Sequence, residues 1–159
     1  MKVLVLGGTG NISRAVVSAL LRKNHEVVLF NRGLNPDLPP SGIRVITGDR
    51  RNRDHFKQIL SGQNFDYVID MICFNLEDAR SDFDVFREKV AHFIHCSTVM
   101  TYGPPFPGIN LDESSPLNGH SKYSLDKISA DEFFLRKHQD VGFPVTILKP
   151  SLTFGANVL

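Results

Sequence analysis

The sequence has little net charge and no long apolar run. Its 159 residues carry a formal net charge of +1, so electrostatics give no broad reason to expect a nucleic acid or an anionic membrane as partner. No apolar run approaches the length that spans a bilayer, and Met1-Lys2 leads directly into a predicted strand rather than a signal peptide. We therefore expect a cytoplasmic protein with no membrane partner.

Cysteine is also scarce. Cys73 and Cys96 each lie in or beside a predicted strand, and they could be two buried thiols or a disulfide or redox pair; we favour the thiols of a reducing cytoplasm. No group of histidine, cysteine and acidic residues has the spacing of metal ligands, so we predict no metal site. A Gly-x-Ser-x-Gly motif or Ser-His-Asp arrangement is not visible either, which argues against that type of hydrolase.

Short apolar runs alternate with amphipathic segments along the chain. Strands are predicted at 2–6, 26–30, 43–46, 67–72, 92–96 and 143–148, and helices from about 11, around 56–60, at 76–90 and at 120–138. Alternation of this kind favours a parallel sheet with helices on both faces. A nucleotide motif on the first strand makes this a doubly wound Rossmann fold with strand order 3-2-1-4-5-6. We see no linker and predict one domain over residues 1–159.

The nucleotide motif is Gly8-x-Gly10-x-x-Ser13, placed where the first strand turns into the first helix. The first glycine permits the tight turn, and Gly10 lets the backbone approach a pyrophosphate without an intervening Cβ. The helix N-terminus then supplies free N–H groups and a partial positive charge. Ser13 replaces the third glycine of the pattern, and its small side chain still allows close packing. The segment predicts a dinucleotide site.

Asn31 stands at the end of the second strand, where an acidic residue usually binds the ribose hydroxyls of NAD. A neutral side chain does not repel a 2′-phosphate, and the neighbouring Arg32 could pair with one. The cofactor is therefore NAD or NADP, and we favour NADP; Arg32 as a solvated loop charge is the alternative. Asp49 follows the third strand and is placed either to accept a hydrogen bond from adenine or to stabilise a turn.

Tyr123 and Lys127 lie four residues apart on one face of a predicted helix. A phenol with a pKa of about 10 is a poor base at neutral pH. A nearby ammonium and the positive nicotinamide of an oxidised cofactor both favour the phenolate, which could then take a proton from a substrate hydroxyl. The pair alone is common on helices. Combined with the glycine turn, it predicts redox chemistry on a hydroxyl or carbonyl.

Ser97 and Thr98 follow the fifth strand at its carboxyl end, the edge where open α/β sheets bind ligands. Either hydroxyl could orient the substrate oxygen, and register favours Thr98; a hydroxyl that only caps the local backbone is the alternative. His95 falls within a strand and is more typical of a core residue than of a catalyst. His120 could simply help to begin the following helix.

The motifs together resemble the extended short-chain dehydrogenase/reductase superfamily, the NAD-dependent epimerase/dehydratase group. They occur in order as Gly7-Gly8-Thr9-Gly10-Asn11-Ile12, Gly48-Asp49, Thr98 with Tyr102-Gly103, Tyr123-Ser-Leu-Asp-Lys127 and Lys149-Pro150…Phe154-Gly155. The resemblance implies Thr98, Tyr123 and Lys127 as the catalytic set. It implies cofactor contacts from Gly7, Gly10, Asn11, Ile12, Arg32 and Asp49, and a nucleotide sugar or similar small molecule as substrate.

The chain departs from this group in three respects. Its fourth strand ends Asp70-Met71-Ile72-Cys73 rather than in the more usual His-x-Ala-Ala, its ribose position is Asn31, and it is about half the usual length. Members of the group carry a C-terminal lobe that binds the sugar. We therefore expect the cofactor-binding, N-terminal part of a longer enzyme, which binds NAD(P) but turns over a nucleotide sugar poorly.

Two further expectations come from the resemblance. Relatives similar to chloroplast stem-loop RNA-binding proteins use this fold outside sugar metabolism, so a non-catalytic, RNA-associated NAD(P)-binding protein is the alternative function. The local basic cluster of Arg44, Arg50, Arg51 and Arg53 is interrupted by acidic residues, which makes nucleic acid the less favoured partner. A homodimer is also expected, since helices near 76–90 and 120–138 pair with their symmetry mates in the family.

Overall fold

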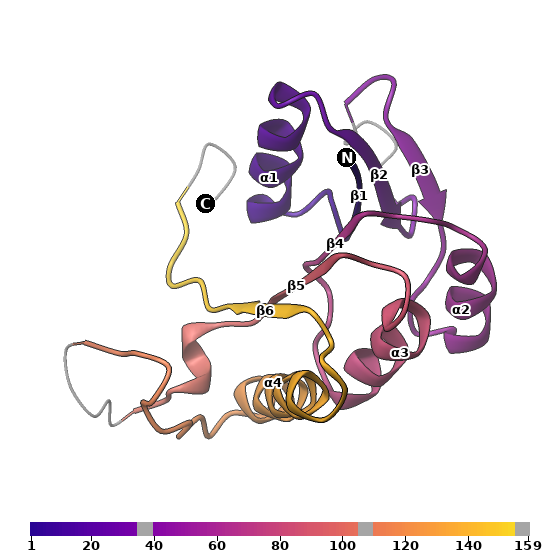
Figure 1. Cartoon of the computed structure of the whole chain (residues 1–159). Coiled ribbons are helices and arrows are strands. Elements are labelled where there is room, and N and C mark those ends of the chain that lie inside the picture. The colour runs from indigo at the N-terminus through magenta and orange to yellow at the C-terminus, as the bar shows by residue number, and fades with distance from the viewer. Residues whose placement is uncertain (35–39, 105–109, 155–159) are drawn as a thin grey trace.

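The computed structural model of the protein describes residues 1–34, 40–104 and 110–154. It forms one six-stranded sheet with the order β3-β2-β1-β4-β5-β6 (Figure 1), so the predicted strand order is confirmed. The strands are β1 (Lys2–Leu6), β2 (Glu26–Asn31), β3 (Arg44–Thr47), β4 (Tyr67–Asp70), β5 (His92–Cys96) and β6 (Val145–Leu148). Every neighbouring pair in this sheet is parallel.

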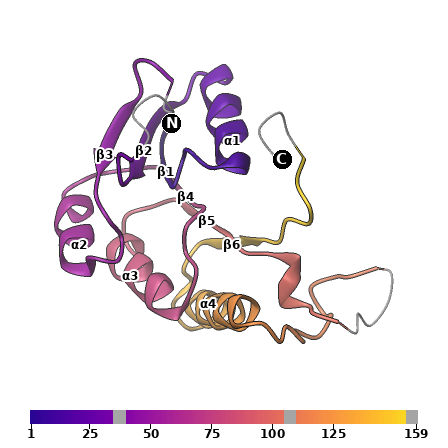
Figure 2. The same ribbon diagram turned by 180° about the vertical axis from the view of Figure 1, so that it is seen from behind.

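The helices cover the sheet unequally. They are α1 (Asn11–Arg22), α2 (Arg53–Ser61), α3 (Leu76–Phe86) and α4 (Lys122–Val141). Figures 1 and 2 show α1 on one face of the sheet and the other three helices on the opposite face. The alternation of β1 explains this division: Leu4 and Leu6 join the core beneath α2–α4, whereas Val3 and Val5 pack with Val17 of α1.

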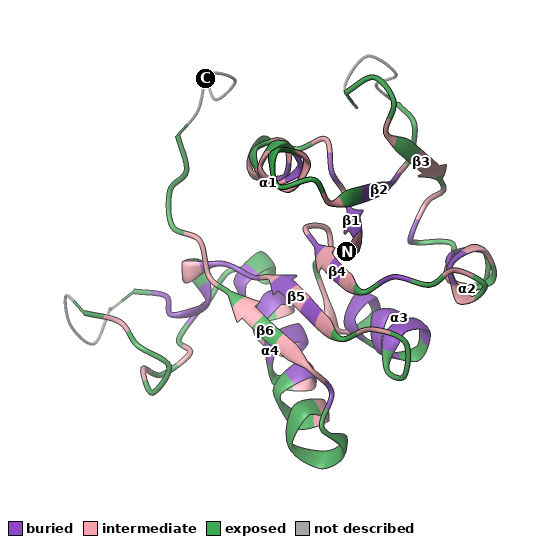
Figure 3. Cartoon of the chain, turned by 45° about the horizontal axis from the view of Figure 1, so that its top comes forward, coloured by how far each residue is buried: buried purple, intermediate pink, exposed green. Residues whose placement is uncertain are grey.

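The larger core is built around phenylalanines. Phe93 of β5 packs against rings from α3, α4 and the loop before β6, with centroid separations of 5.9 Å to Phe86, 5.3 Å to Phe134 and 5.5 Å to Phe143. Buried residues run through the central strands and the sheet-facing sides of α3 and α4 (Figure 3). This core fixes α4, the helix of Tyr123 and Lys127, against β5, the strand that Thr98 follows.

Several predicted boundaries were wrong by a few residues. The strand predicted at 67–72 ends at Asp70, where the side chain accepts a hydrogen bond from the N–H of Ile72 and turns the chain out of the sheet. The helix predicted to reach 90 ends at Phe86, and the last helix runs to Val141, where Gly142 adopts a left-handed conformation with φ of 69°. A 3₁₀ turn, Val99–Thr101, follows β5 and was not predicted.

Some predictions concern other features of the fold. Both cysteines are free thiols, Cys73 buried and Cys96 half-buried, as favoured over a disulfide. Gly155 of the final motif lies outside the described residues. None of the helices in the described ranges is both long and apolar enough to cross a bilayer.

Candidate functional site

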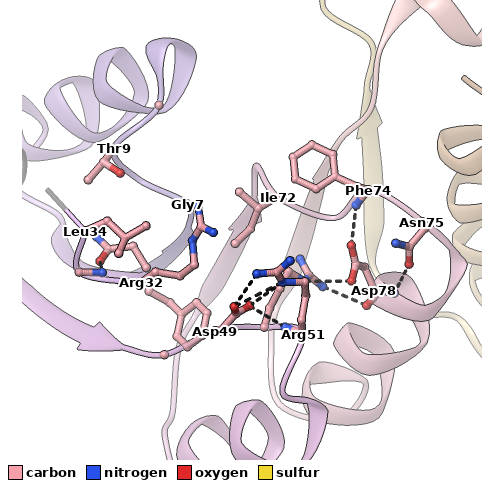
Figure 4. A pocket seen from close by; sticks show the side chains of 16 residues that line it. Gly7, Thr9, Arg32, Leu34, Asp49, Arg51, Ile72, Phe74, Asn75 and Asp78 are labelled. Carbon is pink, nitrogen blue, oxygen red and sulfur yellow. Dashed lines mark hydrogen bonds and ion pairs between the residues drawn. The ribbon is translucent and has the colours of Figure 1, made fainter. Parts of the chain in front are cut away.

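A pocket of about 470 Å³ opens at the carboxyl ends of the central strands. Gly7, Thr9, Arg32 and Leu34 lie along one wall, and Phe74, Asn75 and Asp78 lie along the opposite wall (Figure 4). Asp49 and Arg51 lie between the two walls, and Ile72 lies above them in this view. This edge, beside the first strand, is where doubly wound sheets bind ligands.

The glycine turn packs closely against neighbouring side chains of the protein. Its left-handed residue is Gly7, with φ of 82°, rather than Gly8 as the sequence suggested. A Cβ on Gly7 would lie 2.3 Å from Cγ2 of Ile72, and one on Gly8 would lie 2.5 Å from Cδ2 of Leu29. A serine at position 13, where the pattern has glycine, stabilises the turn because its hydroxyl donates to the carbonyls of Gly7 and Gly10.

The first turn of α1 presents its backbone to this pocket. Gly10 is the N-cap residue, and no side chain in the described part of the chain caps the helix there. A Cβ on Gly10 would meet only the Ser13 hydroxyl, at 3.3 Å, and the Gly7 carbonyl, at 4.0 Å. Space and helix N–H groups for a diphosphate are therefore both present. Asn11 and Ile12 lie in this first turn but are not among the residues that line the pocket.

Charged groups meet at the far end of the pocket, after β2 and β3. The side chain of Asn31 accepts a hydrogen bond from the N–H of Gly33, 2.8 Å away. Asp49 accepts hydrogen bonds from the backbone and guanidinium of Arg51, and these bonds lower the pKa of the Asp49 carboxyl below its usual value. Arg32 lowers it further through its charge. The structure thus brings together Asn31, Arg32 and Asp49, with Arg51 as an additional cation.

Behind the pocket lies a buried ion cluster that the sequence did not predict. The guanidinium of Arg50 lies 2.6 Å from Asp70 and 2.9 Å from Asp82. Its Nε lies 3.4 Å from Asp78, beyond good hydrogen-bond geometry, and has no hydrogen-bond partner among the described residues. We call Arg50, Asp70, Asp78 and Asp82 the Arg50 cluster. It explains why Asp70 stands at the end of β4, where the family pattern has histidine.

The pKa values of two carboxyls in the Arg50 cluster shift in opposite directions. Burial, and then the charge of Asp70, raise the pKa of Asp82 well above its usual value despite Arg50. Burial acts to raise the pKa of Asp70 too, but Arg50 and a hydrogen bond with Asp82 bring it below its usual value. The Sγ of Cys73 and oxygens of Asp70 and Asp82 lie within 4.8 Å of one another. Arg50 already binds both carboxyls, and the absence of a metal site stays a prediction.

Lys127 of α4, one of the predicted catalytic residues, is not among the residues that line the pocket. Its side chain is buried, with 2 % of the residue exposed, and its ammonium donates to the carbonyls of Cys73 and Cys96, each 2.7 Å away. These carbonyls follow β4 and end β5. The ring of Phe74 covers the ammonium, with its centroid 5.0 Å from Nζ. The structure therefore places Lys127 beneath the sheet edge that the pocket occupies.

Tyr123 lies one turn earlier on α4 and remains 45 % exposed. Partial burial raises the pKa of its phenol above the usual value, and the nearby Thr98 hydroxyl opposes this rise. The sequence suggested that a nearby lysine would lower the pKa of this phenol, but the protein groups raise it instead. Thr98 also caps the 3₁₀ turn, accepting from the N–H of Met100 at 3.2 Å. Thr98, Tyr123 and Lys127 nevertheless converge at one end of α4.

Asp131 was missed by sequence reasoning and organises the residues behind the catalytic set. One oxygen lies 3.1 Å from Nε2 of His95, and the other accepts from the Ser97 hydroxyl at 2.9 Å and pairs with Lys149. We call His95, Ser97, Asp131 and Lys149 the Asp131 cluster. The buried Ser97 hydroxyl is thus occupied by Asp131, and Thr98 is the hydroxyl of the two that is left for a substrate. The spacing of Asp131, four residues after Lys127, was the available signal.

The basic cluster seen in the sequence does not form a free cationic surface. Arg50 is buried in its cluster, Arg51 pairs with Asp49 at 3.0 Å, and Arg53 pairs with Asp78 at 2.5 Å. Arg44 donates to the side chain of Gln63 at 3.0 Å. Carboxylates balance the charges of three of the four arginines. Arg44, bonded to the neutral side chain of Gln63, is the member of the segment whose charge no carboxylate among the described residues balances.

The fold and this edge define a class of proteins, the doubly wound dinucleotide-binding domains. Residues 3–158 match the model of the NAD dependent epimerase/dehydratase family. The chain belongs to this family, which confirms the resemblance inferred from its motifs.

Individual relatives differ in what their names describe. The chain is 32% identical over 134 residues to 2′-dehydrokanamycin reductase of Streptomyces kanamyceticus, covering 83% of this chain and 37% of that protein. It is 31% identical over 114 residues to the chloroplast stem-loop binding protein of 41 kDa b of Arabidopsis thaliana, covering 64% and 30% respectively.

A solved structure shows the same fold. The dTDP-glucose 4,6-dehydratase of Bacillus anthracis, in complex with NAD, superposes with a TM-score of 0.83 at 19% identity. This match covers 98% of the present chain and 56% of the dehydratase chain. The chain therefore spans about a third of the two curated relatives and about half of the dehydratase structure.

Proposed function

We propose that this chain supplies the NAD(P)-binding and proton-transferring part of an epimerase, dehydratase or reductase that acts on a hydroxyl or carbonyl group. One observation carries the proposal. Lys127 is buried between the carbonyls of the residues that follow β4 and end β5, one helical turn from Tyr123, at the same carboxyl edge of the sheet that holds the glycine turn. The family to which the chain belongs supports the same chemistry.

Each residue then has a role that its position supports. When bound, the nicotinamide cofactor supplies hydride transfer. Tyr123 takes a proton from the substrate hydroxyl, or returns one to a carbonyl, through its half-exposed phenol. Thr98 lies near that phenol and orients the substrate oxygen. Lys127 places a fixed positive charge one turn below Tyr123 and favours the phenolate as charge develops.

The cofactor end of the site supports NADP over NAD. Asn31 puts no carboxylate at the ribose, and Arg32 and Arg51 bring two guanidinium groups to the same end of the pocket. Only one acidic side chain, Asp49, faces these two among the lining residues of that end. A 2′-phosphate would therefore meet net positive charge. Calorimetric titration with both cofactors tests this preference, and tighter binding of NAD would overturn it.

A nucleotide sugar or a related small molecule is the substrate we propose. The Bacillus anthracis structure is a dTDP-glucose dehydratase, and the Streptomyces kanamyceticus relative is a reductase of dehydrokanamycin. The present chain spans only part of either protein. We therefore infer that the 159 residues bind cofactor but turn over such a substrate slowly, because further residues would enclose it.

Single-turnover kinetics provide the test. Chain saturated with NADP⁺ or NAD⁺ is mixed with excess UDP-glucose or dTDP-glucose, and reduced nicotinamide is followed by its absorbance. We expect slow reduction that falls by about 100-fold or more in Tyr123→Phe, with cofactor affinity unchanged. Tyr67→Phe is the matched control, since Tyr67 lies in β4 and packs against the α1 side of the sheet. Equal rates in Tyr123→Phe and the parent would refute the catalytic assignment.

A second candidate is an RNA-associated protein without catalysis, which similarity to the stem-loop binding protein supports. The pairing of Arg44, Arg50, Arg51 and Arg53 with neighbouring side chains weighs against it. Binding to a stem-loop RNA, measured from low to physiological salt, decides between the two. A steep loss of affinity with salt, together with no hydride transfer, would favour the RNA-associated protein.

We also propose a homodimer formed through α3 and α4. Leu125 and Leu135 of α4 are about half exposed, which leaves apolar surface on a helix that already packs against α3. Sedimentation equilibrium should give a dimeric mass, and Leu125→Lys with Leu135→Lys should reduce it to the monomer. A monomer at high concentration of the parent chain would contradict this proposal.

A further inference from the structure

The Arg50 cluster lies beside the pocket and binds the segment after β4 that carries the Cys73 carbonyl. Arg50 follows Asp49, which lines the pocket, and its guanidinium reaches Asp70 at the end of β4 and Asp82 in α3. We propose that Arg50, through Asp70 and Asp78, positions Lys127 by fixing the backbone segment 71–74. This inference rests on the proposed role of Lys127, and none of the three residues touches the reacting atoms.

The first step is the hold of the cluster on the backbone. One oxygen of Asp70 accepts from the N–H of Ile72 at 2.6 Å, while the other accepts from Arg50. Similarly, Asp78 accepts from the N–H of Phe74 at 2.8 Å. The N–H groups of Ile72 and Phe74 are therefore fixed by the carboxylates of Asp70 and Asp78. Arg50 donates to the Asp70 carboxylate and to the backbone carbonyl of Asp78, while Arg53 pairs with the Asp78 carboxylate. Charge-assisted bonds of this type are shorter and stronger than neutral ones.

The second step leads from this segment to the ammonium. The carbonyl of Cys73, between the two fixed amides, accepts from Lys127 at 2.7 Å. A buried ammonium requires acceptors for its N–H groups, and it loses solvation that only well-placed oxygens replace. The carbonyl of Cys96 is the other acceptor, and it belongs to the regular edge of β5. The Cys73 carbonyl lies outside a strand and depends on the carboxylates for its orientation.

The third step concerns the pocket. Ile72 and Phe74 line it from the same segment, and Asp49, Arg50 and Arg51 line it from the loop after β3. Arg50 therefore connects the loop after β3 to segment 71–74, and a ligand that contacts one of these loops affects the position of the other. The ion pair of Arg53 with Asp78 closes the outer side of the cluster, with Arg53 about one-third exposed. The position of the Lys127 ammonium is thus linked to the loop that contains Asp49.

Two readouts report this link without any catalytic assay. The first is amide hydrogen exchange of residues 71–74, and the second is the rate at which an amine-directed acylating reagent modifies Lys127, identified by peptide mass. We compare the parent with Arg50→Lys, which keeps the charge but loses the planar guanidinium that bonds two carboxyls at once, and with Asp78→Asn. Arg80→Gln is the control, because Arg80 forms an exposed pair with Glu77 on the same helix.

We expect segment 71–74 to exchange about tenfold faster or more in Arg50→Lys and Asp78→Asn, and modification of Lys127 to accelerate by a similar factor. Exchange in β1 and β2 should stay as in the parent, which separates local release from general loss of stability. In Arg80→Gln both rates should equal those of the parent. A variant in which all segments accelerate equally would show a general structural role and overturn the proposal.

The unmodified protein provides an independent check should the variants fail to fold. Amides of Ile72 and Phe74 should be among the slowest outside the strands, and fast exchange there would by itself refute the proposal. The readouts also separate it from the proposed function. Accelerated labelling of Lys127 with no effect of Tyr123→Phe on hydride transfer would support the positioning link and refute the oxidoreductase assignment.

Discussion

Two buried charge clusters support the site, and they are built in opposite ways. In the Arg50 cluster one guanidinium gathers three carboxyls, whereas in the Asp131 cluster one carboxylate gathers an imidazole, a hydroxyl and an ammonium. The first joins the loop after β3 to β4 and α3 beneath the cofactor pocket. The second joins α4 to β5 and to the residue after β6, beneath Thr98 and Tyr123.

The difference shows how excess charge of one sign is accommodated in a protein interior. Three carboxyls around one guanidinium exceed its charge. Burial raises the pKa of Asp82, which favours its neutral form, and Arg53 adds a positive charge at the edge of the cluster. Around Asp131 the donors are in excess, and burial lowers the pKa of His95 so that this imidazole stays neutral. Proton uptake or release adjusts each cluster toward neutrality.

The largest expected effect is the loss of Arg50. Arg50→Met leaves buried carboxyls without their cation, and we expect the free energy of unfolding to fall by about 3–5 kcal/mol. Urea unfolding followed by far-ultraviolet circular dichroism measures this. Arg80→Met, at the exposed pair with Glu77, should change stability by less than about 1 kcal/mol. A similar small effect for Arg50→Met would mean that the cluster contributes little.

The Asp131 cluster should tolerate disruption better. Asp131→Asn removes the charge but keeps the shape, and Lys149 is partly exposed and can regain water. We expect a loss of about 2–3 kcal/mol, less than for Arg50→Met. The control is Asp126→Asn, since Asp126 pairs with Lys122 at the surface of the same helix. A larger loss for Asp131→Asn than for Arg50→Met would reverse the comparison.

His95 and Asp82 should give opposite dependences on pH. Burial lowers the pKa of His95, so the unfolded chain binds a proton near pH 6.5 that the folded chain does not. Stability from this residue is complete above that pH and decreases as pH falls toward 5, by at most about 1.4 kcal/mol per pH unit. In His95→Gln, unfolding free energies between pH 7 and 5 should lose this decline. An unchanged slope would show that His95 binds its proton equally in the folded and unfolded chain, against a lowered pKa.

Asp82 supplies the opposite slope. Its raised pKa means that the folded chain keeps a proton which the unfolded chain releases near pH 4. Its contribution to stability therefore decreases as pH rises from about 4 to the pH at which folded Asp82 ionises. Asp82→Asn cannot ionise, so its stability relative to the parent should increase between pH 5 and 8. A constant difference across this range would show that Asp82 is ionised throughout.

The architecture was largely predictable from local sequence. Alternating apolar runs and amphipathic segments predicted all six strands, and the position of the glycine turn on the first of them predicted their order. Boundaries failed where a side chain ended an element, as Asp70 does for β4 through its bond to Ile72. That event depends on one hydrogen bond, which hydrophobic periodicity does not report.

The candidate site was predictable only in part. The spacing of Tyr123 and Lys127 placed both on one helix, and the structure sets Lys127 against the Cys96 carbonyl at the end of β5, just before Thr98; their catalytic role stays a prediction. The arginines after β3 appeared as a basic surface in the sequence, yet Arg50 is buried and its partners lie 20 to 32 residues further along the chain. Pairing over such separations is set by the fold rather than by neighbouring residues.

The sequence by itself determined the fold family, the turn at Gly7–Gly10 and the helical pairing of Tyr123 with Lys127, because each depends on local conformation or regular periodicity. Tertiary structure alone decided which charges are buried together: Arg50 with Asp70, Asp78 and Asp82, and Asp131 with His95 and Lys149. These pairings arise because packing helices onto a sheet removes water from side chains of distant segments, and each buried charge must then find its partner within the protein.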